Sequence, residues 1–231
     1  MIPNSHTATV DRYLETIFYI ASEEFVVRPS RISAWLSVSA PTVTDGLKRL
    51  ERDGWITIAL DRSVQLTATG LALASSVVRR HRVLERWLTD VLGFDWAEAD
   101  LEAERIATTI SDDVIDRIDQ SMGTPATCPH GNAIPGREPG YGELISLDQL
   151  KVSTRAHVRR ISEVGEHEGN ELLSSLARHG IGEGTEITVV AHDAGDGSIR
   201  VQSKNGDLEF DATSARSIWV ELETATAPSC S

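Results

Sequence analysis

The chain has 231 residues, of which 40% are hydrophobic and 25% charged, and this balance excludes a disordered or fibrous protein. No stretch approaches the roughly 20 apolar residues of a membrane span, and the N-terminus has no signal peptide pattern. The two cysteines form neither a disulfide framework nor a CxxC zinc pattern. We therefore expect a cytoplasmic protein that has no membrane partner.

The net charge of −13 argues at first against a nucleic-acid partner, but the charges are unevenly distributed. Residues 1–75 carry 7 basic and 8 acidic side chains, whereas residues 76–231 carry 15 and 27. The first third is therefore almost neutral, and the carboxylates gather in the remainder. Clustered carboxylates are suited to binding a cation, so the two parts are expected to have different roles.

The first 70 residues predict three helices followed by a two-stranded hairpin. Apolar residues recur at helical spacing from Val10 to Ala21, and a second helix follows with Ser30 as its N-cap. A third helix begins behind Ser39, has Pro41 just inside its start and ends at Gly54. The segments WITIAL and VQLTATG then read as two short strands. This order is typical of a winged helix-turn-helix.

Helical patterns continue after the hairpin and then give way to short strands. We expect a long amphipathic helix over residues 68–92, a second from Trp96 to Ile110 and a third that begins behind Ser111. A segment rich in Gly and Pro follows, and short alternating segments with a tight hairpin at Asn205-Gly206 predict a small SH3-like barrel. The fold class is therefore α+β.

Five segments occur in an order and at a spacing that point to one family: SAPTVTDGLKRLERDGWI, DRSVQLTATG, VVRRHRVLERWLTDVLG, SDDVIDRI and PHGNAIPG. The chain resembles the diphtheria toxin repressor family of iron- and manganese-dependent regulators. The resemblance implies a homodimeric repressor of metal homeostasis genes that responds to Mn²⁺ or Fe²⁺ and binds palindromic double-stranded operator DNA. It also implies a winged helix-turn-helix at 1–70, a helical metal-binding and dimerisation domain at 71–123, a linker at 124–150, an SH3-like (FeoA-type) domain at 151–224 and a disordered tail at 225–231.

The helix that begins behind Ser39 would be the recognition helix, with its N-terminal end in the major groove. Ser39 and Thr44 can hydrogen-bond phosphates or base edges, while Pro41 and the methyl group of Thr42 can contact thymine methyls. Asp45 would repel phosphate but could accept a hydrogen bond from cytosine. The phosphate-contact candidates are basic: Arg28, Arg31, Lys48, Arg49, Arg52 and Arg62. The alternatives are a solvated helix face and a winged helix that binds protein.

The resemblance implies an ancillary metal site that combines residues far apart in the sequence. His81 and Glu85 are four residues apart and share a helix face, and Asp100 is the matching position on the next helix. Glu168 and Glu171 would complete the set from the C-terminal domain. One imidazole and several carboxylates suit Mn²⁺ or Fe²⁺ better than copper or zinc. The alternative is that His81 and Glu85 pair with neighbouring arginines on an exposed helix.

The primary metal site of the family is degenerate in this chain. Arg12 occupies a ligand position, and a guanidinium cannot bind a metal. Glu104 and Glu15 are retained carboxylates, but Ala107 and Thr108 stand where the family has Glu and His. We expect no transition metal here. Arg12 could instead lie between Glu15 and Glu104 as a fixed positive charge; the alternative is an exposed Arg12 on a decayed site.

Two other functions compete with the metal-responsive repressor. One is a regulator of the same fold that has become independent of primary-site metal through Arg12, and the other is a protein-interaction adaptor that uses its SH3-like domain. An enzyme is not expected, because Glu102 is the only candidate base near the ancillary ligands and no nucleophile motif is present. Cys128-Pro129-His130 is interpreted as a packed turn of the linker.

Overall fold

The computed structural model describes residues 7–23, 26–163 and 172–223. The described chain divides into two compact units. The first contains the residues up to Phe94 with Glu98–Ala126 and Ile134–Arg137, and the second contains Asp95–Ala97, Thr127–Ala133 and the residues from Glu138 onward. None of the described helices combines the length and hydrophobicity that crossing a membrane requires. Glu168, Glu171 and the tail from Ala225 lie outside the described residues.

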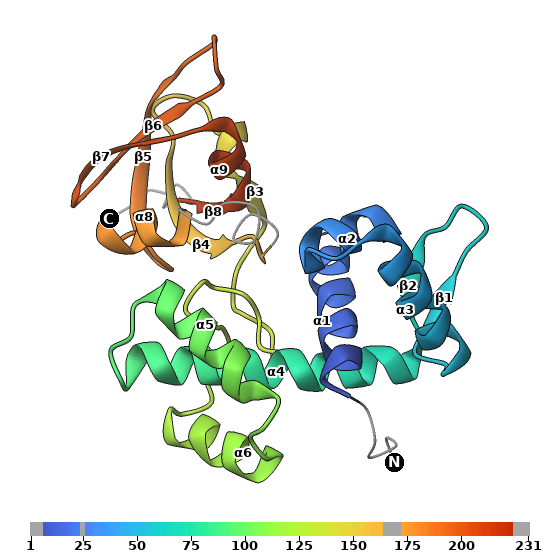
Figure 1. Cartoon of the computed structure of the whole chain (residues 1–231). Helices are drawn as coiled ribbons and strands as arrows, with labels where there is room; N and C mark the ends of the chain where they lie inside the picture. Colours follow the sequence, from blue (N-terminus) through green and yellow to red (C-terminus); the bar gives the residue numbers. More distant parts are fainter. Residues whose placement is uncertain (1–6, 24–25, 164–171, 224–231) are drawn as a thin grey trace, which may run out of the picture. The chain divides into compact units, whose positions relative to one another are not determined.

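The first unit begins with the predicted winged helix-turn-helix (Figure 1). Its elements are α1 (Ala8–Ser22), α2 (Pro29–Leu36), α3 (Ala40–Arg52), β1 (Ile56–Ile58) and β2 (Val64–Leu66). The two strands pair antiparallel, with Ile56 opposite Leu66 and Ile58 opposite Val64. Side chains from all three helices and both strands share one buried core with the start of the next helix.

The ends of these helices follow local chemistry. The Ser39 hydroxyl accepts a hydrogen bond from the Thr42 backbone N–H at 3.3 Å, so Ser39 caps α3 as predicted. Gly54 follows the helix with a φ of +81°, a left-handed conformation that favours glycine. The prediction that Ser30 caps α2 is wrong, because the helix already begins at Pro29, whose fixed φ suits the first helical position.

Helices α1 and α3 approach each other closely at Gly46. A Cβ atom at this position would lie only 2.8 Å from the Tyr13 ring. Tyr13 is 7% exposed, and its ring therefore fills the space that the missing side chain leaves. A side chain at position 46 would therefore require the Tyr13 ring to move.

The rest of the first unit is helical, with α4 (Ala68–Asp90), α6 (Asp112–Ser121) and α5 (Trp96–Ala107) from Glu98 onward. The buried stripe of α5 consists of alanines, which allow close helix packing in a core with Leu84 and Ile115. α5 ends three residues before the predicted Ile110. Ser111 precedes α6 as expected, although its side chain makes no capping hydrogen bond.

A buried carboxylate joins three segments of the first unit. Asp119 on α6 is 2% exposed, and its Oδ2 accepts a hydrogen bond from Arg79 of α4 at 2.8 Å. Arg137 also donates to this oxygen and to the backbone carbonyl of Pro125. Removing the carboxylate would leave two partly buried guanidinium groups without this shared partner.

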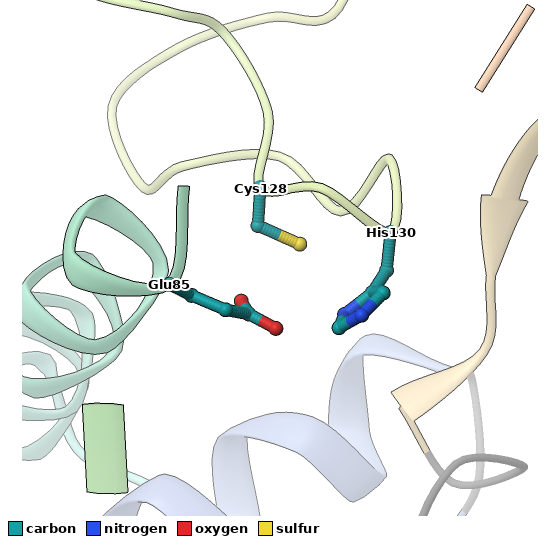
Figure 2. A group of neighbouring side chains, drawn as sticks. All are labelled: Glu85, Cys128 and His130. Atoms are coloured by element: carbon teal, nitrogen blue, oxygen red, sulfur yellow. The ribbon is translucent and has the colours of Figure 1, made fainter. Parts of the chain in front are cut away.

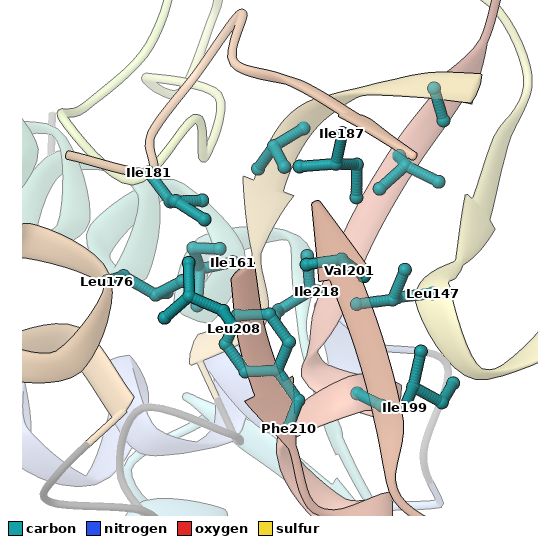
Figure 3. Close-up of a cluster of buried hydrophobic side chains, with 14 of the residues drawn as sticks. Leu147, Ile161, Leu176, Ile181, Ile187, Ile199, Val201, Leu208, Phe210 and Ile218 are labelled. Carbon is teal, nitrogen blue, oxygen red and sulfur yellow. The ribbon is translucent and has the colours of Figure 1, made fainter. Parts of the chain in front are cut away.

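The second unit is built on a six-stranded antiparallel sheet in the order β3-β8-β4-β5-β6-β7. Its strands are β3 (Leu144–Ser146), β4 (Arg155–Ile161), β5 (Glu186–His192), β6 (Ile199–Ser203), β7 (Gly206–Phe210) and β8 (Ile218–Leu222). The short helices are η1 (Leu147–Gln149), α8 (Leu172–Arg178) and α9 (Ala212–Ser217). Apolar side chains from sheet and helices fill one core, in which Leu176, Ile218 and Phe210 lie close together (Figure 3).

One boundary and one helix of the second unit differ from the sequence prediction. The linker does not extend to Leu150, because β3 pairs with β8 and belongs to the sheet. α9 was also missed, and its cap explains why it forms: Asp211 accepts hydrogen bonds from the backbone N–H groups of Thr213 and Ser214, each at 2.8 Å. The hairpin at Asn205-Gly206 was predicted correctly, with Ser203 opposite Gly206.

Candidate metal centre and DNA-binding surface

Three potential metal ligands of the first unit meet between α4 and α5. Each of His81, Glu85 and Asp100 offers a ligand atom, and these atoms lie within 4.8 Å of one another. Nε2 of His81 lies 3.1 Å from Oδ1 of Asp100. His81 and Glu85 are 8% and 3% exposed. The two α4 side chains therefore do not lie on an exposed helix face, as the alternative interpretation required.

Glu15 brings α1 to this cluster. Its Oε1 lies 3.9 Å from Nδ1 of His81, and the hydroxyl of Tyr19 donates a hydrogen bond to the same oxygen at 3.0 Å. The sequence analysis had placed Glu15 with Glu104 in the degenerate primary metal site instead. Helical spacing places Glu15 on a face of α1, but only the packing of α1 against α4 determines which ligands it meets.

The carboxylates change the protonation of His81. Burial lowers the pKa of this imidazole, but the hydrogen bond to Asp100 and the charges of Glu85, Glu15 and Asp100 outweigh burial and raise it to about 10. At neutral pH the metal-free cluster therefore holds an imidazolium among three carboxylates. A metal ion would take the place of that proton, because only the neutral imidazole can bind a metal.

The donor set fits a divalent cation. One imidazole nitrogen and the carboxyl groups of Glu85 and Asp100 lie within 4.8 Å of one another, and this oxygen-rich set matches Mn²⁺ or Fe²⁺. The cluster also combines a residue of the winged helix, Glu15, with residues of the helices that follow. A cation held by His81, Glu85 and Asp100 would join α4 to α5, and Glu15 approaches His81 from α1.

The degenerate primary site is not assembled. Glu104 is exposed on α5, and the Ala107 methyl group is buried in the helical core where the family pattern has a carboxylate. Arg12 is also exposed, and within the described part of the chain it makes no ion pair with Glu15 or Glu104. The expected Arg12 bridge is therefore absent from this structure, because the side chain points into solvent and Glu15 faces His81.

Cys128 and His130 leave one turn on the same side, and their ligand atoms lie within 4.8 Å of each other (Figure 2). The turn is closed by hydrogen bonds from Cys128 N–H to the Asn132 carbonyl at 2.9 Å and from Gly131 N–H to the Cys128 carbonyl at 3.0 Å. Among the described residues of the second unit, no third His, Cys, Asp or Glu joins this pair. Within that unit the packed-turn interpretation fits. Glu85, which is also drawn, belongs to α4.

The side chains expected to contact DNA lie on the surface of the winged helix. Ser39 also bonds Thr42 Oγ1 at 2.8 Å, and Thr44 Oγ1 donates to the Ala40 carbonyl at 2.9 Å, so these hydroxyls already have partners within α3. Arg28 and Arg52 pair with acidic neighbours. The exposed candidates are Arg28, Ser39, Pro41, Thr42, Thr44, Asp45, Lys48, Arg49, Arg52 and Arg62, and Arg31 is half-buried.

Comparison with known proteins explains this combination of a winged helix with a metal-ligand cluster. The iron-dependent repressor N-terminal DNA-binding domain matches residues 6–64, and the metal-binding and dimerisation domain of the same repressors matches residues 67–136. The chain belongs to the iron-dependent repressor family. A FeoA domain matches residues 145–222, in agreement with the predicted SH3-like domain.

Individual members of the iron-dependent repressor family align over most of the chain. The iron-dependent repressor IdeR of Mycobacterium tuberculosis is 35% identical over 207 residues, which cover 85% of this chain and 90% of that protein. The diphtheria toxin repressor of Corynebacterium diphtheriae is 32% identical over 225 residues, covering 92% and 96%. A manganese-dependent transcriptional repressor in complex with manganese superimposes with a TM-score of 0.81 at 28% identity, covering 93% and 100%.

The comparisons confirm the predicted resemblance, the α+β fold class and a transcriptional regulator rather than an enzyme. Family members include iron- and manganese-dependent repressors, which agrees with the expected Mn²⁺ or Fe²⁺. The chain contains both the DNA-binding and the dimerisation domain of the family.

Proposed function

We propose that this protein is a metal-responsive transcriptional repressor that binds palindromic operator DNA as a homodimer, and that His81, Glu85, Asp100 and Glu15 form its sensing site for Mn²⁺ or Fe²⁺. The observation that carries the proposal is the Glu15–His81 approach at 3.9 Å, since it links the DNA-binding helices to the metal-binding helices. Glu168 and Glu171 remain candidates for additional ligands.

A bound divalent cation would supply positive charge that offsets the repulsion among the carboxylates. The protein's own residues provide the rest of the response. Glu85 and His81 are fixed by burial on α4, while Glu15 belongs to α1, which packs in the same core as α3. Drawing Glu15 toward His81 would therefore hold the recognition helix in one orientation relative to α4.

The exposed residues of the winged helix would make two classes of contact with the operator DNA. The N-terminal end of α3, from Ser39 to Asp45, would lie in the major groove, and the basic residues around it would contact phosphates. A homodimer presents two such helices related by a twofold axis, so the expected operator is a palindrome. The exposed Arg12 gives no support to the metal-independent alternative.

The test is fluorescence anisotropy of a labelled DNA fragment from upstream of the protein's own gene. The protein is titrated with Mn²⁺, with Fe²⁺ under anaerobic conditions, or with a chelator, and Glu85→Gln is compared with the matched control Glu104→Gln. We expect tight binding only with metal, loss of that binding in Glu85→Gln and no change in Glu104→Gln. Equal binding with metal and chelator would contradict a metal response.

A further inference from the structure

The solvent-facing side of the six-stranded sheet carries polar side chains across three neighbouring strands, β4, β5 and β6 (Figure 1). Side chains along a strand alternate between its two faces, so the neighbours of the buried Ala156 and Ile187 point toward solvent. The register sets Arg155 of β4 opposite Thr188 of β5, and Thr188 opposite Gln202 of β6. One row of polar side chains therefore crosses the three strands.

A second row lies two residues along the strands from the first. His157 of β4 is opposite Glu186 of β5, and Lys204 follows the last residue of β6. Side chains directly opposite each other in an antiparallel pair lie about 5 Å apart, so the two rows form one surface. Together with Gly184 and two hydroxyl side chains they line a groove of about 530 Å³. All the lining residues belong to the second unit.

The basic side chains of this groove differ from other arginines of the same strands. Arg159 of β4 pairs with Glu221 at 2.7 Å, and Arg200 of β6 pairs with Glu209 at 3.1 Å. Within the described ranges, three basic side chains of the groove make no ion pair: Arg155, His157 and Lys204. The groove thus concentrates uncompensated basic groups in a chain whose net charge is −13.

The lining suits a ligand that carries both an anionic group and hydroxyl groups. A guanidinium binds phosphate as a bidentate fork, and an ammonium binds it as a point charge. Glu186 would repel a bare anion, but its carboxylate can accept hydrogen bonds from hydroxyl groups, and Gln202 can both donate and accept. No aromatic or long aliphatic side chain is among the described lining residues, so a nucleobase or an acyl chain would find no apolar surface.

We propose that this groove binds a phosphorylated polyol, such as a sugar phosphate. Arg155 and Lys204 hold the phosphate, and the His157 imidazole donates a further hydrogen bond to it. Glu186 and Gln202 bind the hydroxyl groups of the polyol. The site adds a small-molecule ligand to the metal ion and the DNA proposed above, and it does not depend on either of them because its residues all lie in the second unit.

The experiment is a two-dimensional NMR titration of the ¹⁵N-labelled full-length chain, kept metal-free so that phosphate cannot bind to a metal ion. The probes are glucose 6-phosphate, inorganic phosphate, glucose and a hexaglutamate peptide. We expect glucose 6-phosphate to shift the amide signals of Gly184 and Thr185 with a Kd of about 0.1–1 mM, as for a small ligand in an open groove. Inorganic phosphate should bind about tenfold more weakly, because it makes no hydroxyl contacts, and glucose should not bind.

Two variants and a matched control assign the contacts. Arg155→Gln should weaken glucose 6-phosphate binding about tenfold, because a charge-assisted contact is lost. Arg200→Gln is the control: it removes an exposed arginine on the same face of β6 but outside the groove, and the affinity should stay within about twofold. Glu186→Ala should weaken glucose 6-phosphate but strengthen inorganic phosphate, since it removes a hydroxyl acceptor and a repulsive charge. All three side chains are exposed, so the melting temperature should change by no more than about 2 °C.

Each of four results would overturn the inference. Equal losses of affinity in Arg155→Gln and Arg200→Gln would show that general charge, and not the groove, attracts the ligand. Inorganic phosphate that binds as tightly as glucose 6-phosphate would reduce the groove to a simple anion site. Binding of hexaglutamate without binding of glucose 6-phosphate would assign the groove to an acidic peptide. Unshifted Gly184 and Thr185 signals at about 10 mM glucose 6-phosphate would show that the groove binds no such ligand.

Discussion

The protonation of His81 leads to a prediction about the stability of the metal-free protein. The pKa of His81 is raised to about 10 in the folded chain, compared with 6.5 for an ordinary histidine. Because folding raises this pKa, the protonated imidazole stabilises the fold fully below pH 6.5, and this contribution is lost as the pH rises toward 10. Raising the pH from 6.5 to 9.5 should therefore remove about 3 to 4 kcal/mol from the free energy of unfolding.

The assay is urea-induced unfolding at pH 6.5 and 9.5 in the presence of a chelator. Wild-type protein should lose stability steeply across this range, whereas His81→Gln should depend on pH much less. His179→Gln removes an exposed histidine of the second unit and should retain the wild-type dependence. If His81→Gln loses as much stability as the wild type between the two pH values, the imidazolium does not interact with the carboxylates as described.

Three further substitutions test other parts of the structure. Asp119→Ala should lower the free energy of unfolding by about 3 kcal/mol, because two arginines lose a buried partner, and urea unfolding at neutral pH measures this. Gly46→Ala should destabilise the winged helix by about 1–2 kcal/mol, since its Cβ would lie 2.8 Å from the Tyr13 ring; a thermal melt that does not fall would contradict the close packing. Arg12→Met should leave the free energy of unfolding unchanged and should alter the DNA affinity measured with chelator by no more than about twofold. A larger change would indicate that Arg12 bridges Glu15 and Glu104.

Much of the first unit could be predicted from local sequence. Helical periodicity, the Ser39 cap and the glycine after α3 depend on neighbouring residues, and each was read correctly. The errors occurred where two local signals competed or where partners were distant. Pro29 began α2 before Ser30 could cap it, and β3 was concealed in a Gly/Pro-rich segment because its pairing partner, β8, lies more than 70 residues away.

The candidate site shows the same limit. The spacing of His81 and Glu85 predicts one shared helix face, and the family resemblance added Asp100. Neither could bring Glu15 to His81, because that approach depends on how α1 packs against α4. The Arg12 hypothesis meets the same limit, since sequence alone cannot show that Arg12 lies on an exposed face of α1.

The central claim is that the cluster around His81 is the metal site and that the Glu104 position is not. Isothermal titration of Mn²⁺ into metal-free protein tests it most directly, with His81→Gln, Glu15→Gln and Glu104→Gln compared under the same conditions. We predict one class of site per chain, abolished in His81→Gln, weakened at least tenfold in Glu15→Gln and unchanged in Glu104→Gln. Wild-type affinity in His81→Gln together with loss of binding in Glu104→Gln would contradict the account.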